Sequence, residues 1–136
     1  MCYFLYGAVN EGVNISDYNN AVMNSNFLFK IGTADDVNSF VKNCGTDYRI
    51  TSEHCDCHTS IGCNDANNKE LENYKELLLK FRTIRGIKYV LLSKNWWKNT
   101  NSKHKAVHID DIDISNFLSN IKEDCLYKLE LYPRFF

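Results

Sequence analysis

The sequence has almost no proline and few glycines. Pro133 is the single proline, and the six glycines are scattered over 136 residues. Stretches rich in proline, glycine and serine typically separate domains, and the chain has no such stretch and no internal repeat. Because the length is also close to the commonest size of one domain, we expect residues 1–136 to form a single globular domain.

The chain also lacks an excess of charge of either sign. Lys and Arg number 16 and Asp and Glu number 17, which gives a formal net charge of −1. No block of like charge runs along the chain, so the positive field that attracts nucleic acids and anionic membranes is missing. We therefore expect no nucleic acid and no membrane among the partners.

Long hydrophobic runs are absent as well. Asn, Asp, Lys or Glu interrupts every apolar stretch, and none reaches the roughly 18 residues of a membrane-spanning helix. The first ten residues, MCYFLYGAVN, carry no positive side chain and only a short apolar run, unlike a secretory signal. We expect a cytoplasmic protein, whose reducing surroundings disfavour disulfides.

What the chain does contain is six cysteines, three of which lie with two histidines in the stretch HCDCHTSIGC at 54–63. Thiolates two residues apart in an extended chain point to the same side, so Cys55 and Cys57 can share one ion. Gly62 frees the backbone to bring Cys63 round, and His58 can complete a tetrahedron. Sulfur and imidazole ligands select zinc or iron, so the first hypothesis is a metal-binding protein with the ligands Cys55, Cys57, His58 and Cys63. The spacing is not the CxxC and HxxxH spacing of zinc fingers, and other candidates for the fourth ligand are His54, His104 and His108.

The same loop has two other interpretations. In the second interpretation the protein is a thiol redox protein or a cysteine-dependent enzyme, because a cationic histidine next to Cys55 or Cys57 would stabilise a thiolate. The negative charge of Asp56 would destabilise that thiolate. The third interpretation is that the thiols are structural. Outside the loop, we expect the remaining cysteines to be small buried hydrophobes: Cys2, Cys44 and Cys125.

The stretch from Lys94 to Lys105 is the other unusual one, because Trp96 and Trp97 stand among lysines and asparagines. Paired tryptophans at a strand end can wall a ligand pocket or anchor a partner, and in the plainer alternative one is core and the other covers it. A non-catalytic ligand- or partner-binding domain that uses Trp96 and Trp97 is therefore the second hypothesis.

Two further stretches have structural explanations. Asp110, Asp111 and Asp113 lack the spacing of a calcium-binding loop and precede a helix, which predicts a helix cap. The aromatic tail, 132–136, either closes the edge of the core or docks on a second copy, so a homodimer is a hypothesis.

Short aromatic or β-branched runs predict strands at 3–9, 27–31, 48–51, 87–92 and 126–132. A helix is predicted over 68–85, where apolar residues recur every three or four positions and Gly86 follows. Three more helices are predicted at 16–23, at 33–45, where Thr33 caps and Gly45 follows, and at 115–124.

This alternation predicts an α/β (or α+β) fold with a four- to five-stranded, mostly parallel or mixed sheet covered by three to four helices. In a largely parallel sheet, ligands bind beyond the carboxyl ends of the strands. The loops at 10–12, 53–63 and 93–108 would then share one edge. The sequence indicates these places to look, but no reaction or substrate.

Overall fold

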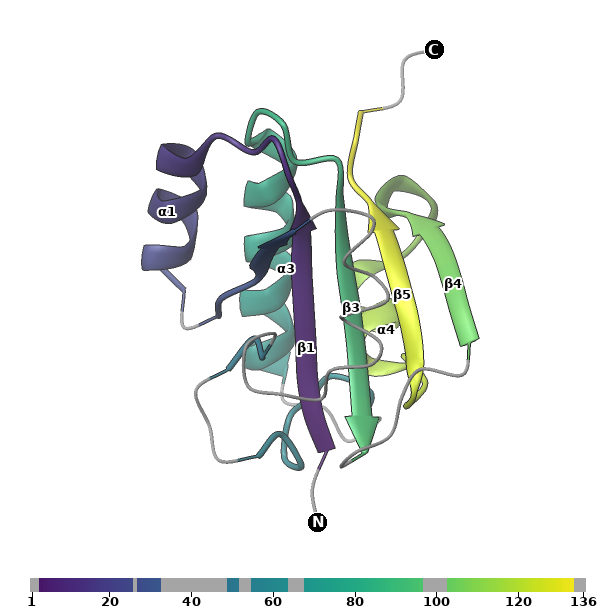
Figure 1. Cartoon of the computed structure of the whole chain (residues 1–136). Helices are drawn as coiled ribbons and strands as arrows, with labels where there is room; N and C mark the ends of the chain where they lie inside the picture. Colours follow the sequence, from purple (N-terminus) through teal and green to yellow (C-terminus); the bar gives the residue numbers. More distant parts are fainter. Residues whose placement is uncertain are drawn as a thin grey trace.

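The computed structural model describes residues 3–25, 27–32, 49–51, 55–63, 68–96 and 103–133, without the side chains of residues 30 and 32. Within these ranges, strands and helices form a mixed α/β arrangement around one sheet (Figure 1). The strands are β1 (Tyr3–Asn10), β2 (Lys30–Gly32), β3 (Tyr89–Trp96), β4 (Lys103–His108) and β5 (Cys125–Glu130). The helical segments are α1 (Ile15–Met23), α3 (Asn68–Thr83), the 3-10 turn η2 (Ile109–Asp111) and α4 (Ile114–Ser119).

The sheet has the strand order β2-β1-β3-β5-β4. β1 pairs with β2 and β4 with β5 in parallel, whereas β3 runs antiparallel to both β1 and β5. Of the two alternatives expected from the sequence, mostly parallel or mixed, the structure therefore has the mixed sheet. In the β1–β3 register Tyr3 pairs with Trp96, so the end of β3 lies beside the start of β1.

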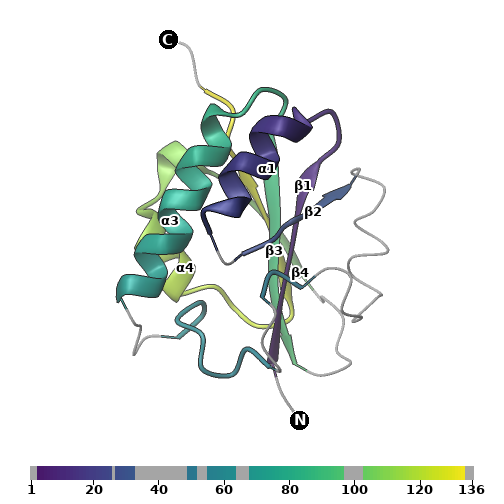
Figure 2. The same cartoon turned by 90° about the vertical axis from the view of Figure 1, so that its left-hand side faces the viewer.

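The helices α1, α3 and α4 lie on the same side of the sheet (Figure 2). The apolar stripe of α3 faces the sheet, because its buried residues recur at helical spacing: Leu71, Tyr74, Leu77, Leu78 and Phe81. Phe81 is fully buried, stacks on Tyr18 and meets the edge of Phe29. Burying a side chain of this kind contributes roughly 1.5–3 kcal/mol to folding. The main core therefore lies between the helices and the sheet, where most of the buried apolar side chains pack together.

The opposite face of the sheet is buried too. Tyr6 and Ala8 of β1, Leu91 of β3 and Leu126 of β5 form a second apolar cluster, against which Phe4 and Tyr89 pack. Because both faces are covered, the middle strands have continuous apolar runs rather than a strict alternation.

The structure confirms most of the predicted elements and shortens others. α1, α3, β1 and β5 lie where the sequence predicts them, within two residues at each end. The helix predicted at 115–124 ends at Ser119, and the strand predicted at 27–31 forms only at Lys30–Gly32. In the run predicted at 48–51, Arg49 makes an isolated bridge to Tyr6. The helix predicted at 33–45 lies outside the described residues.

Two corrections concern the stretch that the sequence assigned to a loop after residue 92. β3 continues to Trp96, and β4 occupies 103–108. β4 escaped prediction because it is an edge strand whose first four residues, Lys103 to Ala106, are all exposed and mostly polar. The segment forms a strand because it pairs in parallel with β5, an interaction that its composition does not indicate.

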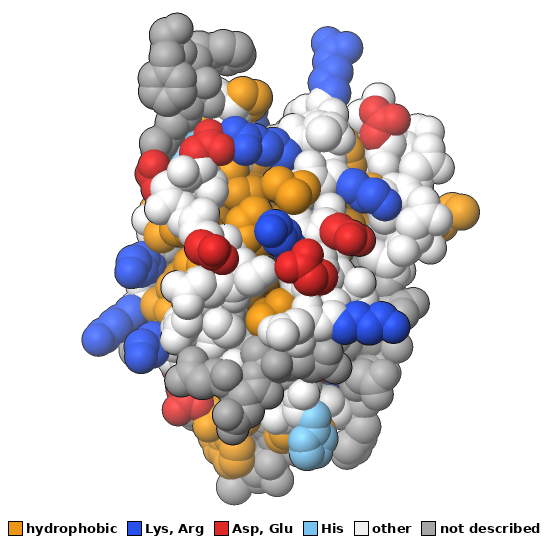
Figure 3. Space-filling model, turned by 180° about the vertical axis from the view of Figure 1, so that it is seen from behind, with side chains coloured by type: hydrophobic (Ala, Val, Ile, Leu, Met, Phe, Trp, Pro, Cys, Tyr) orange, Lys and Arg blue, Asp and Glu red, His pale blue; other side chains and the backbone are white. Residues whose placement is uncertain are grey.

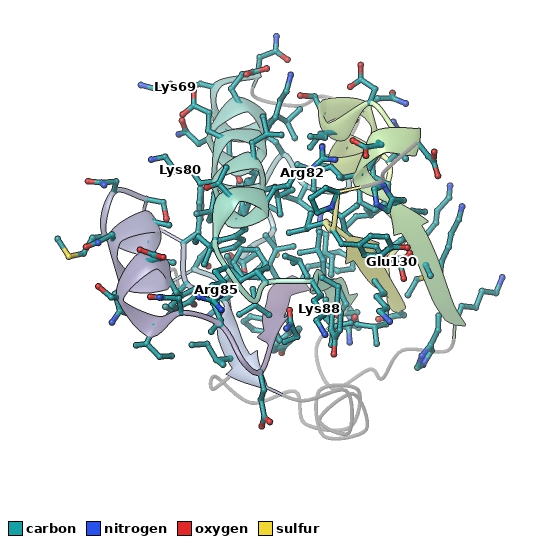
Figure 4. All side chains as sticks on the ribbon, turned by 90° about the horizontal axis from the view of Figure 1, so that it is seen from above. Lys69, Lys80, Arg82, Arg85, Lys88 and Glu130 are labelled. Atoms are coloured by element: carbon teal, nitrogen blue, oxygen red, sulfur yellow. The ribbon has the colours of Figure 1, made fainter. Side chains whose placement is uncertain are left out.

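Of the three aspartates before α4, Asp113 caps the helix as the sequence predicts. The Asp113 carboxylate accepts a hydrogen bond from the backbone N–H of Asn116 at 3.0 Å and caps α4. Asp110 forms an ion pair of 2.6 Å with Arg82 near the end of α3, where Figure 4 labels Arg82. Asp113 therefore begins α4, whereas Asp110 links the end of α3 to η2.

On the helix-covered side of the molecule, acidic and basic side chains are interspersed over the centre of the face (Figure 3). This mixing agrees with the balanced charge of the sequence. Of the helices in the described ranges, none combines the length and the apolarity that crossing a bilayer requires.

The buried hydroxyl of Tyr18 makes the stability of the protein sensitive to alkaline pH. Tyr18 is 3% exposed and donates a hydrogen bond to the carbonyl oxygen of Phe29. Burial raises the pKa of Tyr18 to about 12, although the hydrogen bond to Phe29 works in the opposite direction. The unfolded phenol ionises first, so the contribution of Tyr18 is complete below about pH 10 and is lost between about pH 10 and 12.

We expect this loss to lower the free energy of unfolding by on the order of 2–3 kcal/mol. Urea unfolding measured across that pH window tests it. Tyr18→Phe should show a shallower decline, with a remainder from Tyr74 and Tyr127, whose pKa values burial also raises. Equal declines in the variant and the wild type would contradict the assignment.

Candidate functional site between the 55–63 loop and the α4–β5 turn

The segment 55–63, here called the 55–63 loop, is attached to the sheet through the buried carboxylate of Asp56. The Asp56 N–H donates to the carbonyl of Tyr3 at 2.9 Å, and the carboxylate accepts from the N–H of Leu5 at 2.8 Å. The same carboxylate forms an ion pair with Arg49 at 2.9 Å and accepts a hydrogen bond from the Thr51 hydroxyl. The acidic side chain between the two cysteines thus ties the loop to the start of β1.

A second carboxylate holds the other half of the loop. Glu70, in the first turn of α3, accepts hydrogen bonds from the hydroxyls of Thr59 and Ser60 and from the N–H of Ser60. Nearby, Tyr74 is 1% exposed and its hydroxyl has no hydrogen-bond partner among the described residues. Burial, and then the charges of Glu70 and Asp56, raise the pKa of Tyr74 well above its usual value. A buried polar cluster therefore underlies the loop.

The end of the loop is held against α4 and β3. Gly62 has a φ of 70°, and its N–H donates to the carbonyl of Leu118 at 2.7 Å. The Lys94 ammonium donates to the carbonyl of Ile61 at 2.8 Å, and the carbonyl of Lys94 accepts from the N–H of Asp124 at 3.0 Å. These bonds join the loop, β3 and the α4–β5 turn at one end of the sheet.

The predicted thiol and metal ligands do not come together as a complete set. Cys57 and His58 are exposed, and Cys55 and Cys63 are half-buried. The N–H of Tyr3 points at the sulfur of Cys57 at 3.4 Å. Across the described ranges, no three side chains of His, Cys, Asp and Glu form a group that could hold a metal ion. His54 lies outside these ranges, and the zinc or iron site remains a prediction, as does thiol chemistry.

Trp96 lies at this same end of the sheet. Its ring is half-buried and meets the ring of Tyr3 edge to face, with centroids 4.6 Å apart. The backbone N–H of Trp96 donates a hydrogen bond to the Asp124 carboxylate at 3.2 Å. Trp97 and the phenylalanines of the aromatic tail lie outside the described residues, so the predictions made for them stay predictions.

A pocket of about 370 Å³ opens where these segments meet. Its walls come from β1, the 55–63 loop, β3 and the α4–β5 turn, through the residues Tyr3, Gly62, Lys94, Ser119, Asn120, Ile121, Lys122 and Glu123. The neighbouring Glu123, and then burial, raise the pKa of Tyr3. Two other hollows, beside α1, are bounded by neither of the candidate loops.

Sequence reasoning located the two loops but missed the residues that join them. The sequence gives Asp56 and Glu70 no visible partner, because their partners are far along the chain. Lys94 had a usable signal, since it is the only charged residue in the run YVLLSKNWW at 89–97. A lone lysine in such a run predicts a buried ammonium with a specific role.

No protein-family model, no curated protein and no solved structure matches this chain. The case for a function therefore comes from the geometry of this end of the sheet.

Proposed function

We propose that the protein is a ligand-binding domain and that its binding site is the pocket between the 55–63 loop and the α4–β5 turn. The observation that carries the proposal is the pocket itself, whose volume of about 370 Å³ falls in the range of small-molecule sites. Four segments that are far apart in the sequence build it. The proposal develops the hypothesis that a ligand binds near Trp96 and Trp97. The residues now expected to contact the ligand are the described ones that line the pocket beside Trp96, whereas Trp97 lies outside the described residues.

The loop that forms one wall is held in place before any ligand arrives. Asp56 and Glu70 fix the loop to β1 and α3, and Gly62 is bonded to the end of α4. A binding site that is ordered in advance loses less conformational entropy when it binds. This arrangement supports binding of a ligand that fits a preformed cavity.

The chemistry of the walls suits a small polar molecule. Lys94, Lys122 and Glu123 offer charged groups, and Tyr3 offers a ring with a hydroxyl. Ile121 and the half-buried Trp96 ring beside Tyr3 supply apolar surface in and near the walls. Because most of the lining side chains are polar or charged, the pocket suits a ligand that makes hydrogen bonds and ionic contacts more than an apolar one.

Fragment titrations followed by amide chemical shifts test the proposal. We expect bound fragments to shift the signals of Gly62 and of residues 119–123. Filling the pocket by Ser119→Tyr should weaken binding by about tenfold or more, because the new ring occupies the ligand's space. Ser16→Tyr, on the exposed side of α1, is the matched control and should bind like wild type.

Two outcomes would contradict the proposal. The first is that binding fragments leave the signals of the pocket walls unchanged. The second is that Ser119→Tyr, shown to be folded by its amide spectrum, binds as tightly as Ser16→Tyr.

A further inference from the structure

We propose that the ligand of this pocket carries an oxyanion, a carboxylate or a phosphate group, and that Lys94 binds it. This inference rests on the proposed function and names the chemical class of the ligand. It starts from one observation: Lys94 lines the pocket and is only 8% exposed.

Within the described part of the chain, no carboxylate pairs with the Lys94 ammonium. The hydrogen bond that the ammonium makes goes to a neutral group, the carbonyl of Ile61. The Tyr3 ring lies 5.4 Å from the ammonium and offers a second, weaker interaction. An ammonium has three donors, so at least one is left for a ligand.

A buried charge is costly to keep out of water unless an opposite charge or several hydrogen bonds stabilise it. Lys94 pairs with Leu5 within the β1–β3 ladder, which restricts movement of its backbone toward solvent. An anion in the pocket would supply the missing charge and accept the remaining N–H groups, as oxyanions do at lysine sites.

The other charged walls agree with a small anion. Lys122 is exposed at the rim and adds a second positive charge. Glu123 interacts with Tyr3, whose pKa it raises, and the carboxylate of Asp124 accepts a hydrogen bond from the backbone N–H of Trp96. The residues that line the pocket therefore carry two positive charges and one negative charge.

The test is titration of the wild-type protein with inorganic phosphate and, separately, with succinate, at constant ionic strength and with chloride as the reference salt. We expect saturable shifts of the amide signals of Gly62 and residues 119–123, and an unfolding temperature that rises with anion concentration. Response to phosphate alone, to succinate alone or to both identifies which oxyanion the site takes, and each supports the inference.

Lysine variants separate the specific site from general charge. Lys94→Met should weaken anion binding by about 10- to 100-fold, since it removes a charged hydrogen bond, and Lys122→Met by a few-fold. Lys128→Met is the matched control, because the Lys128 ammonium also lies over a tyrosine ring, that of Tyr89 at 4.6 Å, but does not line the pocket. It should bind the anion like wild type. If Lys94→Met does not fold, the inference is tested by the wild-type titrations and by Lys122→Met. Saturable anion binding that Lys122→Met weakens a few-fold supports the inference, and no saturable binding contradicts it.

The failures of the two proposals are distinguishable. If neutral fragments shift the pocket signals but neither anion does, the anion inference is wrong and the ligand-binding proposal stands. Equal anion affinity in folded Lys94→Met and in wild type would also overturn the inference. If neither fragments nor anions affect the pocket, both proposals are wrong.

Discussion

Replacing Asp56 by alanine is expected to lower the free energy of unfolding by about 3–5 kcal/mol, because it leaves a buried charge without its partner. The Arg49 side chain is 11% exposed and lies over the ring of Phe4, so little water can reach its guanidinium to replace the carboxylate. The N–H of Leu5 and the hydroxyl of Thr51 lose their acceptor in the same step. Urea unfolding at neutral pH measures the change.

Two companion variants identify the cause of this loss. Asp56→Asn removes the charge but keeps an acceptor, so its loss should be smaller than that of Asp56→Ala. Asp113→Ala removes an exposed aspartate that caps α4, and it should cost about 1 kcal/mol. If Asp56→Ala cost no more than Asp113→Ala, the ion pair with Arg49 would not be what holds the 55–63 loop.

Gly86→Ala is expected to lower the free energy of unfolding by about 3–5 kcal/mol, as much as Asp56→Ala. The cause is backbone strain together with a collision between backbone atoms and the new Cβ. Gly86 follows α3 with a φ of 90°, in the left-handed region that favours glycine. A Cβ there would lie 2.1 Å from the carbonyl oxygen of Gly12, so the turn after β1 would have to move away. That movement would break the hydrogen bond from the N–H of Asn14 to the carbonyl of Arg85, a residue that Figure 4 labels.

Gly12→Ala provides the matched control. Gly12 has nearly the same φ, 86°, but an added Cβ would meet no atom within 4 Å. Its cost should be the conformational strain alone, about 1–2 kcal/mol. The difference between the two unfolding free energies thus measures the collision. Equal costs for the two variants would show that α3 and the β1–α1 turn can separate freely.

The parts of the fold that depend on near neighbours were predictable from the sequence. The period of Leu71, Tyr74, Leu77 and Phe81 predicted α3, and Asp113 predicted the start of α4, because such signals act within about four residues. The apolar runs of β1 and β3 predicted strands, since strands buried on both faces have no polar side to alternate. β4 was not predictable in this way, because an exposed edge strand has no apolar pattern.

The candidate site was only half predictable. The sequence drew attention to the 55–63 loop and to Trp96, which lie at the same end of the sheet. It expected the 10–12 loop there too, on the assumption of a parallel sheet. Because β3 runs antiparallel to β1, Trp96 lies beside Tyr3, and Asn10 lies at the opposite end of β1. The direction of one strand thus decided which loops could share a site.

The sequence by itself determined the mixed α/β class, the long helix α3, the cap of α4 and the location of unusual residues. Tertiary structure decided that Asp56 is a buried anchor and that Lys94 is a buried cation lining a pocket. The reason is the distance along the chain over which each interaction acts. Helix period and capping join residues three or four apart, whereas the bond between Leu5 and Asp56 joins residues 51 apart and that between Lys94 and Ile61 residues 33 apart. Only folding brings such groups within hydrogen-bonding distance, so no local pattern records them.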